Sequence, residues 1–291
     1  MALPSIASFW NGAPLTHLER LCLKSFADVG HDVTLYSYEE YLNVPTGVRL
    51  ADARDILPET ALKESHSQSG LAPFSDRFRL NMIYQTGAVW VDCDVVALKQ
   101  LDDLEYVFAK AGRVMGNAIL RLPPHSRTLL DLLEFVNSPH PVIPSDWPWK
   151  RQLSERILAL QSSDGSITLE PHLRAHLPYM TFGPHALTYF LLKNNEAVHA
   201  QPAEHYYSIA PVTLRQNYFR PMRVPVTISD DAILLHHVGG KPFRKKFDTM
   251  GGIVPPHDYS LIGKLCAKHR ITCEGRSSSE DRTANAVLEA V

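Results

Sequence analysis

GAVWVDCDVV, residues 87–96, places two carboxylates directly after an apolar run and then returns to apolar residues. The run before the acids is typical of a strand buried on both faces, as in a parallel sheet. Along a strand, residues i and i+2 point to the same side, so we expect Asp92 and Asp94 to face together and Cys93 to face away. Because two neighbouring carboxylates repel each other, the pattern predicts a cation close to them.

Oxygen ligands of this kind favour a hard divalent ion such as Mn²⁺ or Mg²⁺. The acids also fall at the carboxyl end of the predicted strand, where open α/β sheets bind their ligands. The hypothesis is therefore that Asp92 and Asp94 hold a metal that neutralises a phosphate-bearing ligand. An Asp-x-Asp triplet also arises about once by chance in such a chain, usually as a solvated turn. The buried strand before this one favours the metal.

The surrounding sequence predicts alternating strands and helices. Residues 5–10 and 32–38 have the composition of strands, and 15–30 carries apolar residues at helical spacing up to Gly30. Strand, helix and strand within so short a length predict a βαβ unit and a parallel sheet. Pro73 opens a further helix, which closes at Gly87. Other predicted elements are helices over 126–137, 150–161, 185–195 and 258–270 and a short buried strand over 232–237.

These elements predict an α/β protein with a mostly parallel central sheet flanked by helices. We expect one domain over residues 1–273 and a polar, frayed tail over 274–291. With 291 residues and a net charge of −2, nothing in the composition calls for nucleic acid. No apolar run reaches the ~18 residues of a membrane span, and the start lacks the features of a signal peptide. Four scattered cysteines do not suggest a disulfide scaffold, so we expect a soluble, cytoplasmic protein.

SDRFRLNMIYQTGAVWVDCDVVALKQLDDL, residues 75–104, resembles the donor-site signature of DXD-containing GT-A glycosyltransferases. The pattern is similar to that of the α-1,4-galactosyltransferase and initiating-mannosyltransferase type and, more distantly, to the glucosylating clostridial toxins. Two other stretches resemble the family, SFWNGAP at 8–14 and TFGPHALT at 181–188. The chain departs from the family at 234–247, where LLHHVGGKPFRKKF has histidines but no Ser-Trp pair. The matching residues of the signature are Ser75, Asp76, Arg79, Gly87, Trp90, Asp92, Asp94 and Leu98.

The resemblance implies a Rossmann-like GT-A fold and an enzyme of polysaccharide biosynthesis. Such an enzyme transfers a hexosyl or N-acetylhexosaminyl group from a nucleotide-diphosphate sugar, most plausibly UDP-linked, to a glycan hydroxyl with retention. It implies Mn²⁺ (or Mg²⁺) on Asp92 and Asp94. His236, which is preferred, or His237 would complete the shell or contact phosphate, or would be a core residue. The partners would be the nucleotide sugar and a glycan or lipid-linked glycan acceptor. A lipid-linked acceptor would bring the protein to the cytoplasmic face of a membrane as a peripheral contact.

Donor-binding roles follow from the same resemblance. Asp76 would accept hydrogen bonds from sugar or ribose hydroxyls and orient Arg79 toward phosphate or sugar oxygens. Asp76 is also a good helix-capping type, which is the simpler interpretation of its position. Trp10 and Trp90 would pack on the base and the ribose, or fill the core. Asn117 would reach the transferred sugar.

A basic segment and an aromatic loop leave alternatives open. Lys241 and Arg244 follow two glycines and would either cover the leaving diphosphate or form a solvated stretch. The loop with Asp146, Trp147 and Trp149 would either bind the acceptor or be pinned by its own aromatics, and the second interpretation is preferred. No catalytic residue is assigned, and the candidate bases, Asp230 and Asp231, are not ranked.

Two other functions compete with this one. In a haloacid-dehalogenase-like phosphatase Asp92 would be the nucleophile and Asp94 the acid, but that class needs a later Gly-Asp motif. The chain contains no Gly-Asp dipeptide. A noncatalytic binding protein with a GT-A fold is the other alternative, and hydrolysis of a donor would separate it from an enzyme.

Overall fold

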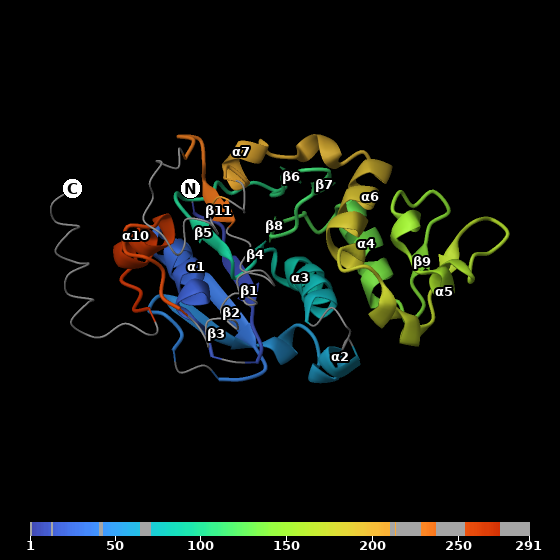
Figure 1. Cartoon of the computed structure of the whole chain (residues 1–291), viewed down its shortest axis with the longest axis horizontal. Helices are drawn as coiled ribbons and strands as arrows, with labels where there is room; N and C mark the ends of the chain where they lie inside the picture. Colours follow the sequence, from blue (N-terminus) through green and yellow to red (C-terminus); the bar gives the residue numbers. More distant parts are fainter. Residues whose placement is uncertain are drawn as a thin grey trace. The chain divides into compact units, whose positions relative to one another are not determined.

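The structure is a computed structural model that describes residues 2–12, 14–40, 43–64, 71–209, 213, 228–236 and 254–273. It confirms an α/β protein whose central sheet is mostly parallel and flanked by helices. The chain divides into two compact units (Figure 1). The predicted single domain over 1–273 stays a prediction, and the predicted tail over 274–291 lies outside the described residues. The first unit comprises Met1–Ala51, Val91–Asp103 and Pro202–Val291, and the second comprises Asp52–Trp90 and Leu104–Gln201.

The predicted βαβ unit forms the beginning of the first unit. Strand β1 (Ile6–Phe9) pairs in parallel with β2 (Val33–Ser37), and β3 (Val48–Asp52) lies on the other side of β2. Every residue of β1 and β2 is buried, which accounts for their apolar composition. Helix α1 (His17–Asp28) connects them. Parallel strands need such a crossover, because a hairpin cannot join them.

Helix α1 begins where the sequence supplies a complete capping box. The Thr16 side chain accepts from the Leu18 amide at 3.2 Å, and the Glu19 carboxylate accepts from the Thr16 amide at 2.8 Å. This satisfies amides that the first turn would otherwise leave unpaired. The apolar stripe of the helix is buried, so the periodic spacing of its leucines reports the core correctly.

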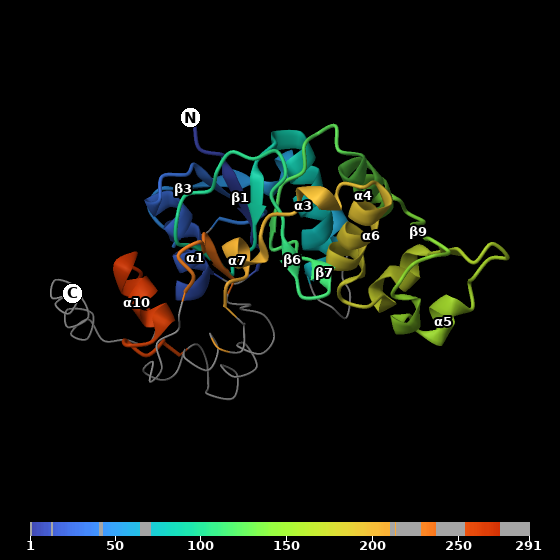
Figure 2. The ribbon, with the colours of Figure 1, turned by 90° about the horizontal axis from the view of Figure 1, so that it is seen from above.

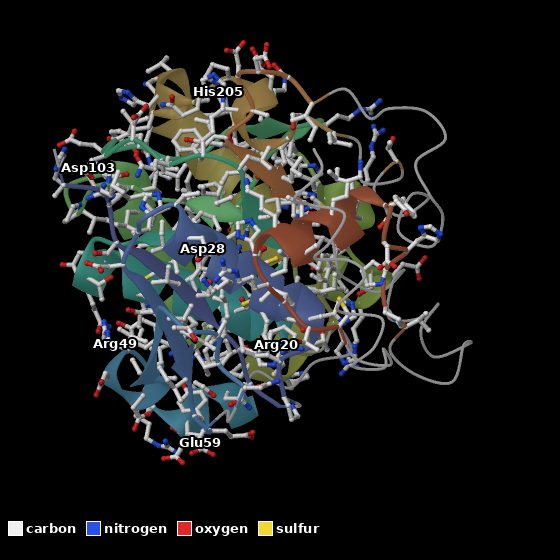
Figure 3. All side chains as sticks on the ribbon, turned by 90° about the vertical axis from the view of Figure 1, so that its left-hand side faces the viewer. Arg20, Asp28, Arg49, Glu59, Asp103 and His205 are labelled. Carbon is white, nitrogen blue, oxygen red and sulfur yellow. The ribbon has the colours of Figure 1, made fainter. Side chains whose placement is uncertain are left out.

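Helix α10 (Leu261–Lys268) lies along α1, as Figure 3 shows with Arg20 and Asp28 labelled on α1. Arg20 donates to the Thr272 carbonyl at 2.8 Å, and His269 Nδ1 lies 2.8 Å from Asp28 Oδ2. Because Arg20 and Asp28 stand near opposite ends of α1, the segment that follows α10 is attached to α1 at two separated points.

Two short strands complete the first unit beside α1. Strand β5 (Val95–Ala97) pairs antiparallel with β11 (Leu234–His236), and α1 packs on β5. The amide of Ala97 donates to Ser25 Oγ at 2.8 Å, which ties β5 to the helix. Helix α7 (Ala203–Tyr206) lies beside β11 (Figure 1).

The second unit is built on three helices that pack together, α3 (Ala72–Thr86), α4 (Arg127–Asn137) and α6 (Ala186–Lys193), as Figures 1 and 2 show. Strand β4 (Val89–Val91) begins in this unit beside β8 (Ile119–Leu120). Pro73 opens α3 and Gly87 closes it in a left-handed conformation (φ 67°), as predicted. Smaller elements are α2 (Glu59–Glu64), β6 (Lys110–Ala111), β7 (Val114–Met115), β9 (Val142–Ile143) and β10 (Ile167–Thr168).

The helix predicted over 150–161 is wrong. The segment forms a short 3₁₀ turn, Lys150–Gln152, and a one-turn helix α5, Glu155–Leu158. Leu153 and Ser154 between them have extended backbones, with ψ of 145° and 154°. A serine favours the position before a helix over its interior, so it divides the amphipathic pattern. No helix in the described part of the chain is long and apolar enough to cross a membrane.

Candidate functional site

The two acids of the opening motif lie in a turn. Strand β4 ends at Val91, β5 begins at Val95, and the Val95 amide donates to the Asp92 carbonyl at 3.1 Å. The prediction that Asp92 and Asp94 lie on a strand is therefore wrong, and the strand alternation from which their common facing was predicted does not apply within a turn. The acids do follow the carboxyl end of a buried strand, as predicted.

Strand β1 holds this turn in place. Ser8 Oγ donates to the carbonyl of Val91, the last residue of β4, at 2.7 Å. The Cys93 sulfur lies 4.0 Å from the Phe9 carbonyl, and burial raises the pKa of the Cys93 thiol well above its ordinary value. The Cys93 thiol is thus neutral at physiological pH.

A histidine from the far end of the chain lies beside the second acid. His236 Nε2 is 3.2 Å from Asp94 Oδ1, because β11 pairs with β5 in a register that sets His236 opposite Val95. The side chains of His236 and Asp94 are 20% and 23% exposed, so both remain accessible to a ligand. Tyr207 packs edge-on against the His236 ring, with 5.8 Å between ring centroids. His237 lies outside the described residues.

The donor set around the turn fits a hard divalent cation. Asp94 supplies a carboxylate, His236 an imidazole, and half-buried Asp92 a second carboxylate two residues away. Within the described ranges no three His, Cys, Asp or Glu side chains are gathered closely enough to hold a metal by themselves. A cation at this turn would therefore need further ligands, such as water and substrate phosphate, which Mg²⁺-type ions commonly use.

Other residues proposed for this part of the molecule are placed individually. Trp10 follows β1, its amide donates to the Tyr36 carbonyl at 3.0 Å, and its side chain is half-buried. Asp230 and Asp231 are exposed in the turn before β11. Lys241 and Arg244 lie outside the described residues.

A second polar cluster lies in the other unit, centred on Asp76 of α3. The capping interpretation of Asp76 is wrong, because α3 begins at Ala72 with Leu71 as its N-cap. Asp76 is only 7% exposed and lies within the sequence of α3, beyond its N-terminal cap. Its Oδ1 atom accepts from Asn117 Nδ2 at 2.8 Å and lies 3.0 Å from Arg79 Nη1. Asp76, Arg79 and Asn117, three residues proposed to bind the donor, are thus brought together.

Trp90 packs against the Arg79 side chain of this cluster. The Arg79 guanidinium lies over the Trp90 ring at 4.9 Å, and Phe78 packs on the same ring with 6.3 Å between centroids. Trp90 is only 1% exposed, so the structure favours the core alternative over stacking on a base or ribose. Its contribution is a cation–π contact that orients Arg79.

Gly183 closes the cluster from the other side. It lies in the π-helical turn Thr181–His185 that precedes α6, within the stretch TFGPHALT. A Cβ atom at this position would lie 2.7 Å from Asp76 Oδ2 and 2.7 Å from Asn117 Nδ2, too close for either contact. The backbone can approach the two side chains only because residue 183 is glycine. A small pocket is lined by Asp76, Arg79, Leu80, Asn117, Leu120, Leu132, Phe182, Gly183 and Leu187.

The aromatic loop is fixed by its own aromatic pair and by contacts with α6 and the turn before it, which agrees with the preferred interpretation and leaves acceptor binding untested. Trp147 is 3% exposed, and Trp149 stacks on His185 with 4.1 Å between centroids and 7° between planes. Tyr189 donates its hydroxyl to Asp146 at 2.8 Å. Burial lowers the pKa of His185 to about 4, so its imidazole is neutral at physiological pH.

The sequence alone did not identify Gly183, Ser8 or Tyr207 as part of these clusters. Gly183 carries a signal, since glycine before proline at the start of a helix indicates a special backbone. Ser8 and Tyr207 carry none, because their roles depend on contacts with residues distant in sequence.

Comparison with known proteins gives similarity at the level of structure. No known family model matches the chain, and no curated protein does. Among solved structures, the chain is similar to one described as PaToxG glycosyltransferase, with 13% identity and a TM-score of 0.41 over 67% of this chain and 72% of that one. It is also similar to the glycosyltransferase domain of the YGT toxin. The ligand-free form has 10% identity and a TM-score of 0.36 over 98% and 89% of the two chains, and the UDP-bound form has 12% and 0.38 over 100% and 89%. Because all three TM-scores lie below 0.5, these similarities do not establish a family for this chain.

Proposed function

We propose that this chain is a metal-dependent glycosyltransferase that uses a nucleotide-diphosphate sugar, most plausibly UDP-linked. It would transfer a hexosyl or N-acetylhexosaminyl group to a glycan hydroxyl with retention, as in polysaccharide biosynthesis. The observation that carries the proposal is the Asp94–His236 pair, two accessible metal-ligand types at the carboxyl end of a buried strand. A phosphate-bearing ligand is what open α/β sheets most often bind at this end.

Asp94 and His236 would hold Mn²⁺ or Mg²⁺ directly, and Asp92 would reach the cation through a bound water, because the three side chains are not gathered closely enough to ligate one ion together. When bound, the cation would stabilise the negative charge that develops on the leaving nucleoside diphosphate. Asp94 is already oriented by His236, so little rearrangement of the carboxylate is needed when a ligand arrives. Trp10, half-buried at the end of β1, is the residue that we assign to the base.

Asp76, Arg79 and Asn117 would bind the sugar portion of the donor. Asp76 has two carboxylate oxygens, each with more than one lone pair, so it can accept from a hydroxyl while keeping its bond to Asn117. Arg79 is fixed by Asp76 and by the Trp90 ring, and a fixed guanidinium binds phosphate or sugar oxygens with little loss of entropy. The interactions of this cluster therefore orient the donor rather than perform chemistry.

The acceptor is assigned as a glycan or a lipid-linked glycan, and the second would bring the protein to the cytoplasmic face of a membrane. Asp230 and Asp231, exposed in the turn before β11, remain unranked candidates for a base. Retention by attack from the same face needs no protein nucleophile, which is consistent with assigning none.

Hydrolysis of a panel of UDP- and GDP-sugars with Mn²⁺ tests this function. We expect release of the nucleoside diphosphate from one donor, its loss when EDTA removes the metal, and a reduction of at least about 100-fold in Asp94→Ala. Glu59→Ala, which removes an exposed carboxylate of α2, is the matched control and should retain the wild-type rate. Metal-dependent release that is the same in Asp94→Ala would contradict the assigned role of the turn.

A further inference from the structure

A rigid loop in the second unit presents an aromatic ring. The loop follows β9 and contains Trp147, which is buried, and Trp149, which is half-buried. Lys150 Nζ donates to the carbonyls of Ser145 and Gly165, each at 2.5 Å, and so fastens the loop to a neighbouring turn. Stacking on His185 sets the plane of the Trp149 ring. The ring is therefore oriented before any ligand binds.

A carboxylate is fixed on the same loop. Asp146 is exposed, and Tyr189 of α6 holds one of its oxygens through a hydroxyl donor at 2.8 Å. The Tyr189 ring contacts Trp147, with 5.2 Å between centroids, and Trp147 contacts Trp149 at 5.5 Å. One network of contacts thus fixes both the carboxylate and the half-buried indole.

The chemistry of this pair matches a sugar ring. A pyranose has a face of C–H groups, which packs on an aromatic surface, and a rim of hydroxyls, which donate to carboxylate oxygens. A large amphipathic side chain such as tryptophan contributes contact area at low cost in conformational entropy. A few positioned polar groups beside it fix the orientation of a ligand.

The chain links this loop to the Asp76 cluster. Gly183 contacts Asp76 and Asn117, and His185, two residues later in the same π-helical turn, stacks on Trp149. Two residues of backbone span at most about 7 Å. The backbone that carries His185 thus connects the Trp149 ring to the residues that we assign to the donor sugar, within one unit of the chain.

We propose that Trp149 and Asp146 form a subsite for a sugar ring of the acceptor. The inference rests on the proposed function and adds to that function a binding site, at which a sugar ring of the acceptor stacks on an aromatic side chain. Trp149 provides the face for the ring, Asp146 accepts from its hydroxyls, and His185 and Tyr189 act as positioning residues.

The test is a titration of the full chain with maltotetraose, cellotetraose and chitotetraose, followed by tryptophan fluorescence, without nucleotide or metal. We expect saturable binding of at least one tetrasaccharide. Trp149→Ala should weaken it by about tenfold or more, and Trp149→Phe, which keeps a ring, by less. Asp146→Asn, at an exposed position, should weaken it by a few-fold and serves as the decisive variant if Trp149→Ala does not fold. Tyr84→Ala, which removes an exposed aromatic of α3, is the control with unchanged affinity.

Binding of none of the tetrasaccharides, or equal binding by the wild type and both loop variants, would overturn the inference. A separate titration of UDP with Mn²⁺ distinguishes this failure from failure of the proposed function. UDP binding without sugar binding would be consistent with the transferase proposal and would overturn the proposed sugar subsite. Sugar binding without any nucleotide binding would overturn the transferase and, with it, the acceptor role of the subsite.

Discussion

The two polar clusters of this molecule differ in how deeply they are buried. Around Asp76, a carboxylate, a guanidinium and an amide are buried against one another and against a glycine backbone. Around Asp94, His236 lies 3.2 Å from a carboxylate oxygen, and the two side chains are 23% and 20% exposed. The first cluster belongs to the folded core as much as to a site, whereas the second is the place that we propose for a cation. Substitutions should therefore affect stability strongly in the first cluster and weakly in the second.

Asp76→Ala should have the largest effect on stability. It leaves Arg79, which is only 4% exposed, without its carboxylate, and removing one partner of a buried ion pair costs about 3–5 kcal/mol. Urea unfolding followed by circular dichroism measures this change. Glu59→Ala breaks an exposed pair with Arg54 and should cost no more than about 1 kcal/mol. An equal decrease in the free energy of unfolding for the two variants would contradict a stabilising role of the Asp76–Arg79 pair.

Gly183→Ala should cost about 2 kcal/mol, because the new Cβ forces Asp76 or Asn117 out of position. Asn117→Ala removes one of the two clashing partners. The double variant should consequently be less destabilised than the sum of the single variants, as expected for residues in contact. The same unfolding measurement decides this, and strict additivity would contradict the close approach of Gly183.

Acidification should destabilise the protein through His185, whose folded-state pKa is about 4 against an ordinary value of 6.5. Above pH 6.5 the imidazole is neutral in both states. As the pH falls from about 6.5 to about 4, the unfolded state binds the proton first, so the free energy of unfolding decreases. After allowance for solvent screening, we expect the free energy of unfolding to decrease by about 2 kcal/mol over this range.

His185→Gln tests this assignment, because glutamine does not titrate. The variant should lose part of the pH dependence of its urea midpoint between about pH 6.5 and pH 4. Wild type and variant measured side by side provide the comparison. Parallel pH profiles for the two proteins would contradict the burial of a neutral imidazole at this position.

Asp94→Ala should have the smallest effect on stability, within about 1 kcal/mol, because the Asp94 and His236 side chains are partly exposed, at 23% and 20%. Its effect should appear instead when ligand is present. Mn²⁺ with UDP should raise the melting temperature of the wild type by mass action and leave that of the variant unchanged. A loss of several kcal/mol in the absence of ligand would place Asp94 in the same class as Asp76.

The sequence predicted those elements whose signals are local. Pro73 and Gly87 gave the limits of α3, and the spacing of apolar residues gave α1, because these signals depend only on nearby residues. The orientation of Asp92 and Asp94 could not be predicted in the same way. It depends on where β4 stops and on the pairing of β5 with β11, which comes from far along the chain.

The site shows the same division between local and distant information. The resemblance named Asp76, Arg79 and Asn117, and the Asp76–Arg79 pair agrees with their spacing of three residues on one helix. The hydrogen bond that joins Asp76 to Asn117, before β8, could not be read from spacing. For Trp90 the sequence left stacking on the donor and filling the core as alternatives, and its burial favours the core. The helix predicted over 150–161 is interrupted at Ser154, because serine favours the position before a helix.

The most direct test of the account is a calorimetric titration of UDP into the full chain, with Mn²⁺ and with EDTA, for the wild type and Asp94→Asn. It needs neither the donor sugar nor the acceptor to be known. We predict that the wild type binds UDP only with Mn²⁺ and that Asp94→Asn loses at least about tenfold in affinity. Equal binding with and without Mn²⁺, or no binding of UDP or GDP under either condition, would contradict the claim that this turn holds the cation of a nucleoside diphosphate.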